Sequence, residues 1–101
     1  MYAARIIGTV VATQKDPRMN SFKMQIVQPV NLITFENEGK PAVAVDAVGA
    51  GDNEIVLVVA GSSARLTELT ENKPVDATIM AIVDYVDIEG KNVFSKNKKE
   101  T

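Results

Sequence analysis

Two short motifs in this chain contain residue types that enzymes use. Gly49-Ala50-Gly51 is glycine-rich, like the loops that bind phosphate, and Gly61-Ser62-Ser63-Ala64-Arg65 places two serines after a glycine. A dinucleotide-binding loop requires G-x-G-x-x-G and then a helix. Here the third position after Gly51 is Glu54, and the following run is typical of a strand. A tight turn between two strands, with both glycines free to take positive φ, is therefore the favoured interpretation.

The serines lack the partners that a nucleophile needs. A nucleophile elbow has the pattern G-x-S-x-G and a histidine elsewhere in the chain, whereas this chain has neither the second glycine nor any histidine. Ser62 is instead interpreted as the N-cap of a short helix that extends to Leu69.

Metal and acid–base chemistry find little support in the composition. The chain has no histidine and no cysteine, so any metal site would consist of oxygen ligands alone. The aspartates are isolated, with no calcium-loop spacing: Asp46, Asp76, Asp84 and Asp87. Paired carboxylates from distant parts of the chain remain the one catalytic alternative. We expect a protein that is not an enzyme, with no catalytic, cofactor-binding or metal-binding residues and no cofactor.

Size and charge define the class of protein. A chain of 101 residues predicts one domain, assigned to residues 1–95, with residues 96–101 as a flexible polar tail. The net charge is −2, and three of the 11 basic residues lie in the tail, which argues against a nucleic-acid partner. No apolar run is long enough to cross a membrane, no secretory signal is visible, and the absence of cysteine suits the cytoplasm.

Alternation of apolar and polar residues predicts several short strands. The expected strands are Tyr2–Thr13, Phe22–Gln28, Ala42–Val48, Glu54–Ala60 and Ala77–Val86, with a turn at 89–92 leading into Val93-Phe94. The first strand should place Ala4, Ile6, Gly8, Val10 and Ala12 on one face. The second should point Phe22, Met24 and Ile26 inward and Lys23 and Gln25 outward.

Two intervals are less regular. Pro17 makes 15–21 a loop. In Asn31–Lys40, apolar residues that require cover precede a turn at 36–39.

Glycine turns between short strands predict an all-β fold. The expected architecture is a small five- to six-stranded antiparallel OB-like β-barrel with one short helix. The run Ile55–Ala60 has no polar residue, so both of its faces need cover, and a partner subunit is the natural cover in so short a chain.

An ordered set of segments resembles the EutN/CcmL family of bacterial microcompartment shell proteins, including those of carboxysomes. The matching segments are Gly8–Lys15, Ala44-Val45-Asp46, Gly49-Ala50-Gly51, Glu54–Leu57, Gly61–Arg65, Pro74-Val75-Asp76 and Ile82-Val83-Asp84. The family commonly has a glycine where this chain has Asn53, and asparagine tolerates the left-handed conformation. The resemblance implies a compact barrel that forms homopentamers at the vertices of a cytoplasmic shell, among hexamer-forming shell proteins.

The resemblance also suggests which residues meet at the subunit interface or line an axial pore. The candidates are Gly49, Ala50, Gly51, Asp52, Asn53, Ser62, Ser63 and Arg65. Arg65 should brace the subunit contacts through an acidic partner, with Asp46, Glu54 and Asp76 as candidates, or else be a surface cation. Ile7, Val11 and Val27 are apolar positions on otherwise polar strand faces and are expected to contribute to the contacts. The alternative function is an OB-like module that binds a ligand or an oligonucleotide.

Overall fold

The computed structural model describes residues 1–12, 15–19, 22–61, 64, 67 and 76–96. Its elements are β1 (Tyr2–Val10), the 3-10 turn η1 (Pro17–Met19), β2 (Met24–Pro29), β3 (Ala42–Asp46), β4 (Ile55–Ala60), β5 (Ala77–Ile82), β6 (Tyr85–Ile88) and β7 (Lys91–Ser95). The helix predicted from Ser62 to Leu69 lies largely outside the described residues. No helix in the described ranges is long and apolar enough to cross a membrane.

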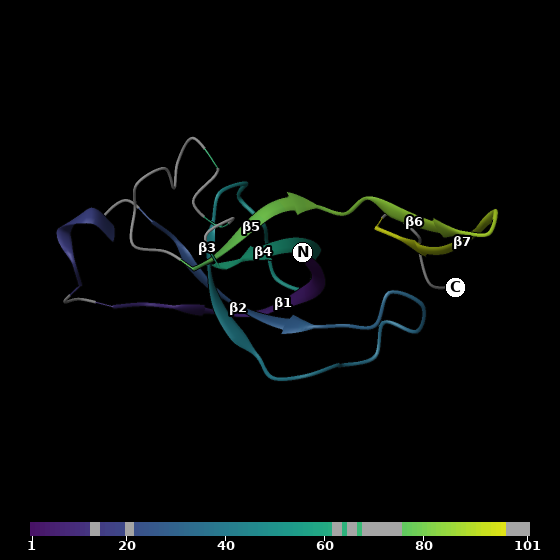
Figure 1. The fold of residues 1–101 in the computed structure, drawn as a ribbon, viewed down its shortest axis with the longest axis horizontal. Coiled ribbons are helices and arrows are strands. Elements are labelled where there is room, and N and C mark those ends of the chain that lie inside the picture. The colour runs from purple at the N-terminus through teal and green to yellow at the C-terminus, as the bar shows by residue number, and fades with distance from the viewer. Residues whose placement is uncertain (13–14, 20–21, 62–63, 65–66, 68–75, 97–101) are drawn as a thin grey trace.

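Five strands close into a barrel in the order β1-β2-β3-β5-β4, and β6 pairs only with β7 in a two-stranded sheet (Figure 1). The predicted barrel is confirmed, but not its uniformly antiparallel pairing, because β3 and β5 run parallel where Val45 faces Thr78. Strand direction cannot alternate all the way around a ring of five. One parallel pair is therefore required, and it occurs where the barrel closes.

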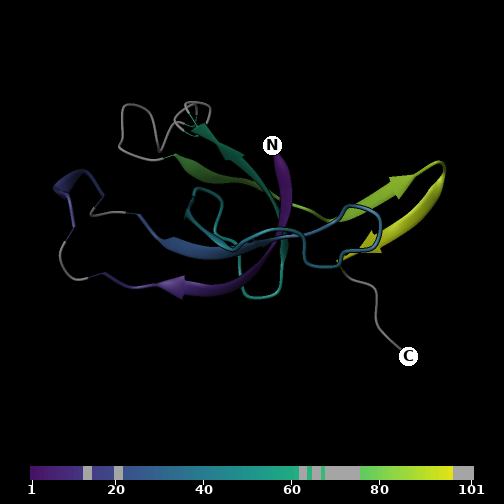
Figure 2. The same cartoon turned by 60° about the horizontal axis from the view of Figure 1, so that its bottom comes forward.

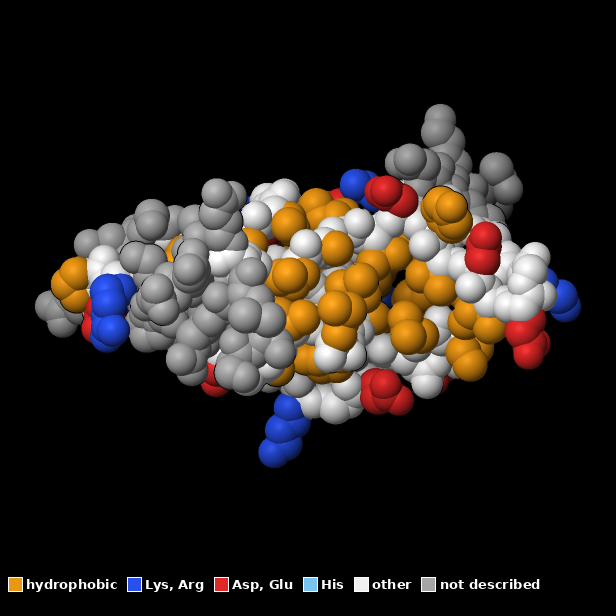
Figure 3. Space-filling view, turned by 45° about the horizontal axis from the view of Figure 1, so that its top comes forward, with side chains coloured by type: hydrophobic (Ala, Val, Ile, Leu, Met, Phe, Trp, Pro, Cys, Tyr) orange, Lys and Arg blue, Asp and Glu red, His pale blue; other side chains and the backbone are white. Residues whose placement is uncertain are grey.

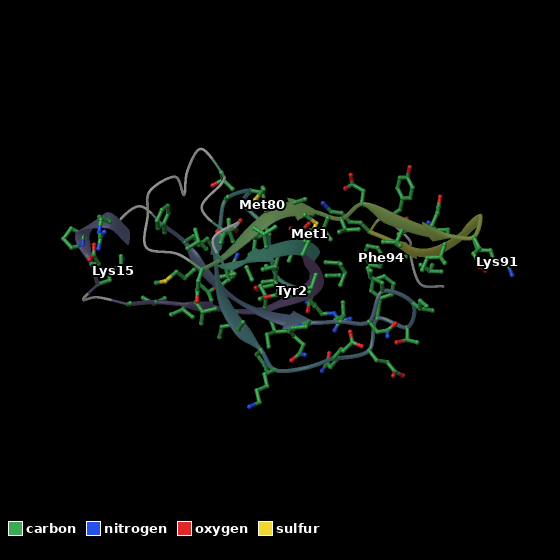
Figure 4. The ribbon with its side chains drawn as sticks, in the orientation of Figure 1. Met1, Tyr2, Lys15, Met80, Lys91 and Phe94 are labelled. Atoms are coloured by element: carbon green, nitrogen blue, oxygen red, sulfur yellow. The ribbon has the colours of Figure 1, made fainter. Side chains whose placement is uncertain are left out.

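The strand predicted from Ala77 to Val86 is divided in two. β5 ends at Ile82, and after Val83 and Asp84 the chain leaves the barrel as the β6–β7 hairpin, which projects beyond it in both cartoon views (Figures 1 and 2). The predicted hairpin turn is confirmed: Glu89 and Gly90 both have positive φ, 51° and 80°, which matches the twist of a two-residue turn. The hairpin is held at its base by the ring of Phe94, which stacks on Phe35 at 5.1 Å between centroids (Figure 4).

A bulge at Ile7 changes which residues of β1 face the barrel interior. Ile6 pairs with Val27, but the next pair is Gly8 with Ile26, so Ile7 has no partner on β2. Beyond the bulge Thr9 pairs with Gln25 and shares its side of the sheet, although Thr9 itself is exposed, while Gly8 and Val10 lie on the other side. The predicted single face from Ala4 to Ala12 is therefore wrong after Ile6, and the described strand ends at Val10.

The predicted orientations are confirmed for Phe22, which is buried, and for Lys23, which is exposed, but those of Met24, Gln25 and Ile26 in β2 are reversed. Gln25 and Val27 point into the barrel and are 1% and 0% exposed, whereas Met24 and Ile26 are half-buried on the outside. The prediction treated Gln25 as a solvent-facing polar residue. It is instead buried because hydrogen-bond partners surround its amide, as described below.

The apolar run of β4 is covered by its own chain. Val56 and Val58 pack in the barrel interior with residues of β1, β2, β3 and β5. On the outside, Val59 packs with Phe22, Val45 and Ala64. Ile55 packs in a third cluster, which joins the hairpin to the barrel. Four of the six residues of β4 are thus buried by their own chain and need no partner subunit, whereas Leu57 is half-buried and Ala60 is exposed.

Candidate functional site

The loop from Ala47 to Asn53, which contains most of the predicted site, is held by a buried aspartate. The carboxylate of Asp46 at the end of β3 accepts three backbone N–H groups in succession. Its Oδ1 accepts from Val48 at 3.0 Å and Gly49 at 2.8 Å, and its Oδ2 accepts from Ala50 at 2.8 Å. These bonds end β3 at Asp46, two residues earlier than predicted, and fix the first half of the loop.

Gln25 connects this aspartate to the rest of the barrel. Its Nε2 donates to Asp46 Oδ2 at 3.2 Å and to the carbonyl of Ala50 at 2.8 Å. Its Oε1 accepts from the hydroxyl of Thr9 at 3.0 Å. One buried amide thus joins β1, β2, β3 and the loop. The sequence analysis missed this residue, since a glutamine between two apolar residues gives the same pattern whether it faces out or in.

The second half of the loop is held by Glu54. Its Oε1 accepts the backbone N–H of Gly51 at 2.6 Å, and its Oε2 pairs with Lys96 Nζ at 2.9 Å. The hydrogen bond from Lys96, followed by that from Gly51, lowers the pKa of the Glu54 carboxyl. The N–H of Lys96 also donates to the carbonyl of Asp84 at 2.7 Å. Lys96, which the sequence analysis assigns to the flexible tail, is therefore attached to the domain.

Only part of the predicted turn geometry is confirmed. Gly49 has a φ of 76°, as expected, but the second left-handed residue is Asn53, with a φ of 65°, and not Gly51. The prediction that Asn53 tolerates this conformation is confirmed. The N–H of Asn53 donates to the carbonyl of Ile6 at 2.9 Å, which ties the end of the loop to β1.

The structure separates the predicted site residues into three groups. Gly49, Asp52 and Asn53 are exposed and Gly51 is half-buried, so the loop presents these four to the surface. Ala50 is buried in the core of its own barrel. Ser62, Ser63 and Arg65 lie outside the described residues. Two of the acidic partners considered for Arg65, namely Asp46 and Glu54, already bind groups within the barrel.

A second surface is the outside of β1, β2 and β3. Gly8, Ile26 and Val43 lie opposite one another across these three strands and form an apolar row. Val10 and Met24 form the next row. Ile7 at the bulge is 50% exposed and Val11 is 86% exposed, as predicted, whereas Val27 points inward and contributes nothing here. We call this surface (Ile7, Val10, Val11, Met24, Ile26 and Val43) the β1–β3 outer face.

Apolar side chains also gather on the side of the molecule that carries β5 and β6. Figure 3 shows them across the middle of this face, with charged side chains at its margins. Tyr85 on β6 and Met1 are the large exposed apolar residues at 64% and 80% exposure. The subunit thus exposes apolar area in more than one place, as is common for a chain that associates.

The described residues provide exposed apolar surfaces and a braced loop. No group of three or more acidic side chains among them is arranged to hold a metal ion. Every buried side-chain nitrogen or oxygen in the described ranges has a hydrogen-bond partner. The hydrogen bonds to Asp46 and Glu54 hold the loop in place and leave Val48, Gly49, Asp52 and Asn53 exposed.

The chain matches one family along most of its length. The family profile described as ethanolamine utilisation protein EutN/carboxysome matches residues 1–84. The carboxysome shell vertex protein CcmL of Nostoc is 42% identical over 101 residues, which cover 95% of each chain. The structure of CcmL from Gloeobacter violaceus superposes with a TM-score of 0.91 at 37% identity, covering 97% of this chain and 100% of that one. A pentameric microcompartment shell protein, GrpN from Rhodospirillum rubrum, superposes with a TM-score of 0.75 at 39% identity, covering 87% and 98%.

Proposed function

This chain belongs to the EutN/CcmL family, and on that premise we propose that it forms homopentamers that cap the vertices of a bacterial microcompartment shell. The observation that carries the proposal is the full-length match to shell vertex proteins in both sequence and structure. One of the matched structures is described as pentameric. A closed shell cannot be tiled by six-fold units alone, and five-fold units at its corners supply the missing curvature.

The folded subunit is suited to a cyclic ring. A ring that closes needs two different surfaces on each subunit, so that each copy contacts the next in the same way. The β1–β3 outer face supplies apolar area for one of them. We place the braced loop at the subunit boundary or around the ring axis, through Gly49, Gly51, Asp52 and Asn53, together with Ser62, Ser63 and Arg65. Hydrogen bonds to Asp46 and Glu54 would keep such a boundary rigid.

The remaining parts of the proposal concern context. We propose hexamer-forming shell proteins as the neighbours of the pentamer and a shell in the cytoplasm as its location. We also propose that the chain catalyses no reaction. The support for this last point is the absence of histidine and cysteine from the whole sequence, together with the vertex-protein names of its relatives.

The alternative, an OB-like module for ligands or oligonucleotides, has weaker support. It rests on the barrel architecture alone, and a fold of this kind hosts many functions. The matched relatives are named for the shell, and the net charge of −2 opposes a phosphate backbone.

Native mass spectrometry of the purified protein tests the proposal directly. We expect a single species of five subunits at micromolar concentration. A monomer or dimer under these conditions would contradict the proposal. Deleting the gene, and any paralogue of it, should leave shells that are open at their corners, and fully closed shells would count against the vertex role.

A further inference from the structure

The loop of residues 31–38 lies at the surface of the subunit, and of its side chains Phe35 packs against the buried cluster of Ala3, Val30 and Ile55. The side chain of Asn31 caps its turn: Oδ1 accepts the N–H groups of Ile33 at 2.8 Å and Thr34 at 3.1 Å. Phe35 takes a left-handed φ of 59°, and its N–H donates to the carbonyl of Asn31 at 2.8 Å. A turn with these bonds has one conformation rather than many.

Contacts with β1 and with the β6–β7 hairpin attach the same loop to the rest of the subunit. Arg5 on β1 donates from its guanidinium to the carbonyl of Phe35 at 3.0 Å. The ring of Phe35 stacks on Phe94 of the hairpin. The residues at the tip, Leu32 and Ile33, are nevertheless 49% and 66% exposed. Two adjacent aliphatic side chains held in a rigid turn and left in water are unfavourable unless a partner covers them.

Charge distinguishes this loop from the opposite end of the subunit. Residues 31–38 contain Glu36 and Glu38 and no basic residue, and neither carboxylate forms an ion pair with another described residue. We call residues 31–38 the acidic loop. The segment 15–24 contains Lys15, Arg18 and Lys23 with a single acid, Asp16, which Arg18 binds at 3.0 Å. We call the described residues of this segment, 15–19 and 22–24, the basic end.

The basic end lies at one end of the long axis, and the acidic loop lies toward the other end, beside the β6–β7 hairpin whose turn at Lys91 forms it. Lys15 lies at one end in Figure 4 and Phe94, which stacks on the acidic loop, lies toward the other. The basic end connects β1 to β2, so it borders the β1–β3 outer face, where Ile7, Val11 and Val43 are exposed. One chain thus has an apolar tip with an acidic margin at one end and an apolar face with a basic margin at the other.

We propose that the acidic loop of one subunit docks on the β1–β3 outer face and basic end of the next subunit in the ring. This inference rests on the proposed pentamer and names the two surfaces that form its contact. Leu32 and Ile33 contact the apolar face, while Glu36 and Glu38 meet the lysines at its margin. The contact is heterologous, as a closed cyclic ring requires, and complementary charge sets its direction.

Paired charge reversals test the proposal. Glu36→Lys with Glu38→Lys should weaken each subunit contact about tenfold or more, because attraction becomes repulsion at an exposed margin. Lys15→Glu with Lys23→Glu should have the same effect, and all four changes in one chain should restore the pentamer in native mass spectra. The matched control is Asp87→Lys with Glu89→Lys at the β6–β7 turn, which makes the same change of charge outside the acidic loop and should leave the pentamer intact.

A second variant tests the apolar part of the contact. Leu32→Ser with Ile33→Ser should weaken association about a hundredfold, while the thermal transition of the barrel stays cooperative, since both residues are exposed in the monomer. Tyr85→Ser, an exposed apolar residue on the β5–β6 side, is the control and should leave the ring unchanged.

The possible outcomes separate the inference from the proposed function. Intact pentamers in all the acidic-loop variants would overturn the docking surface and leave the pentamer standing. The same would hold if those variants formed pentamers that failed to enter shells, because the loop would then contact a different shell protein. A wild-type chain that is not a pentamer would overturn the proposed function itself.

Discussion

The substitution Asp46→Asn removes the charge from the carboxylate that holds the β3–β4 loop and changes almost nothing in its size. In the native chain Oδ1 accepts from Val48 and Gly49, and Oδ2 accepts from Ala50 and Gln25. An asparagine keeps one of these oxygens and places an NH2 group where the other stood. Whichever oxygen is replaced, the NH2 group of the asparagine then faces two N–H donors that can no longer form their hydrogen bonds.

The magnitude follows from the two hydrogen bonds that are lost. A hydrogen bond to a charged group contributes about 1.5–3 kcal/mol. The donors left behind are buried if the NH2 group replaces Oδ2 and part-buried if it replaces Oδ1. We therefore expect Asp46→Asn to lower the free energy of unfolding by about 3–6 kcal/mol. For a domain of this size each kcal/mol corresponds to about 4–8 °C in Tm, so the thermal midpoint should fall by at least about 12 °C.

Denaturant unfolding at fixed protein concentration measures the effect, because association raises the apparent stability of any oligomer. Asp52→Asn is the matched control, since it makes the same chemical change at an exposed position in the same loop. It should alter stability by less than about 0.5 kcal/mol. An Asp46→Asn variant as stable as the control would refute the reasoning that the carboxylate fixes the loop.

Three further predictions concern the same region. Asn53→Val should cost about 1–2 kcal/mol because a branched side chain at a φ of 65° is strained, whereas Asn53→Gly should be neutral or stabilising; equal melting curves for both would contradict this. Because the pKa of Glu54 is lowered in the folded state, its stabilisation is present above its ordinary pKa of 4.5 and is lost as the pH falls through the lowered value. Glu54→Gln should therefore make the free energy of unfolding depend less on pH in the acid range. A variant whose free energy of unfolding falls with pH as steeply as that of the native chain would contradict this prediction. A chain that ends after Lys96 should keep the stability and the oligomeric state of the full chain, and one that ends after Ser95 should lose only a little stability with the exposed ion pair to Glu54; a marked loss in the first chain would show that residues 97–101 hold the domain.

The sequence was most informative where a residue type strongly favours one backbone conformation. Glu89-Gly90 predicted a hairpin turn, and both residues have positive φ. The left-handed tolerance of Asn53 was predicted for the same kind of reason. The barrel class followed from the spacing of strands and glycine turns. Such inferences depend on local backbone preferences and need no knowledge of distant contacts.

The orientation of side chains required the tertiary structure. The alternation in Phe22–Gln28 fits either face, and only the partners of Gln25, which come from β1, β3 and the β3–β4 loop, decide that the amide lies inside. A single bulged residue, Ile7, changes the inward face of β1, and no local pattern marks it. The residues that bury β4 also come from distant parts of the chain, so only the tertiary structure shows that its apolar side chains are packed.

The family of this protein is thus a property of its sequence, since ordered motifs along the chain identify it without coordinates. The sequence also determined that chemistry based on histidine or cysteine is unavailable. Only the tertiary structure decided which residues form a surface. The acidic loop and the basic end differ in charge but are separate in sequence, and nothing in the sequence relates one to the other. They become a complementary pair because the closed barrel holds them at its two ends, and long-range strand pairing, which local preferences do not encode, closes that barrel.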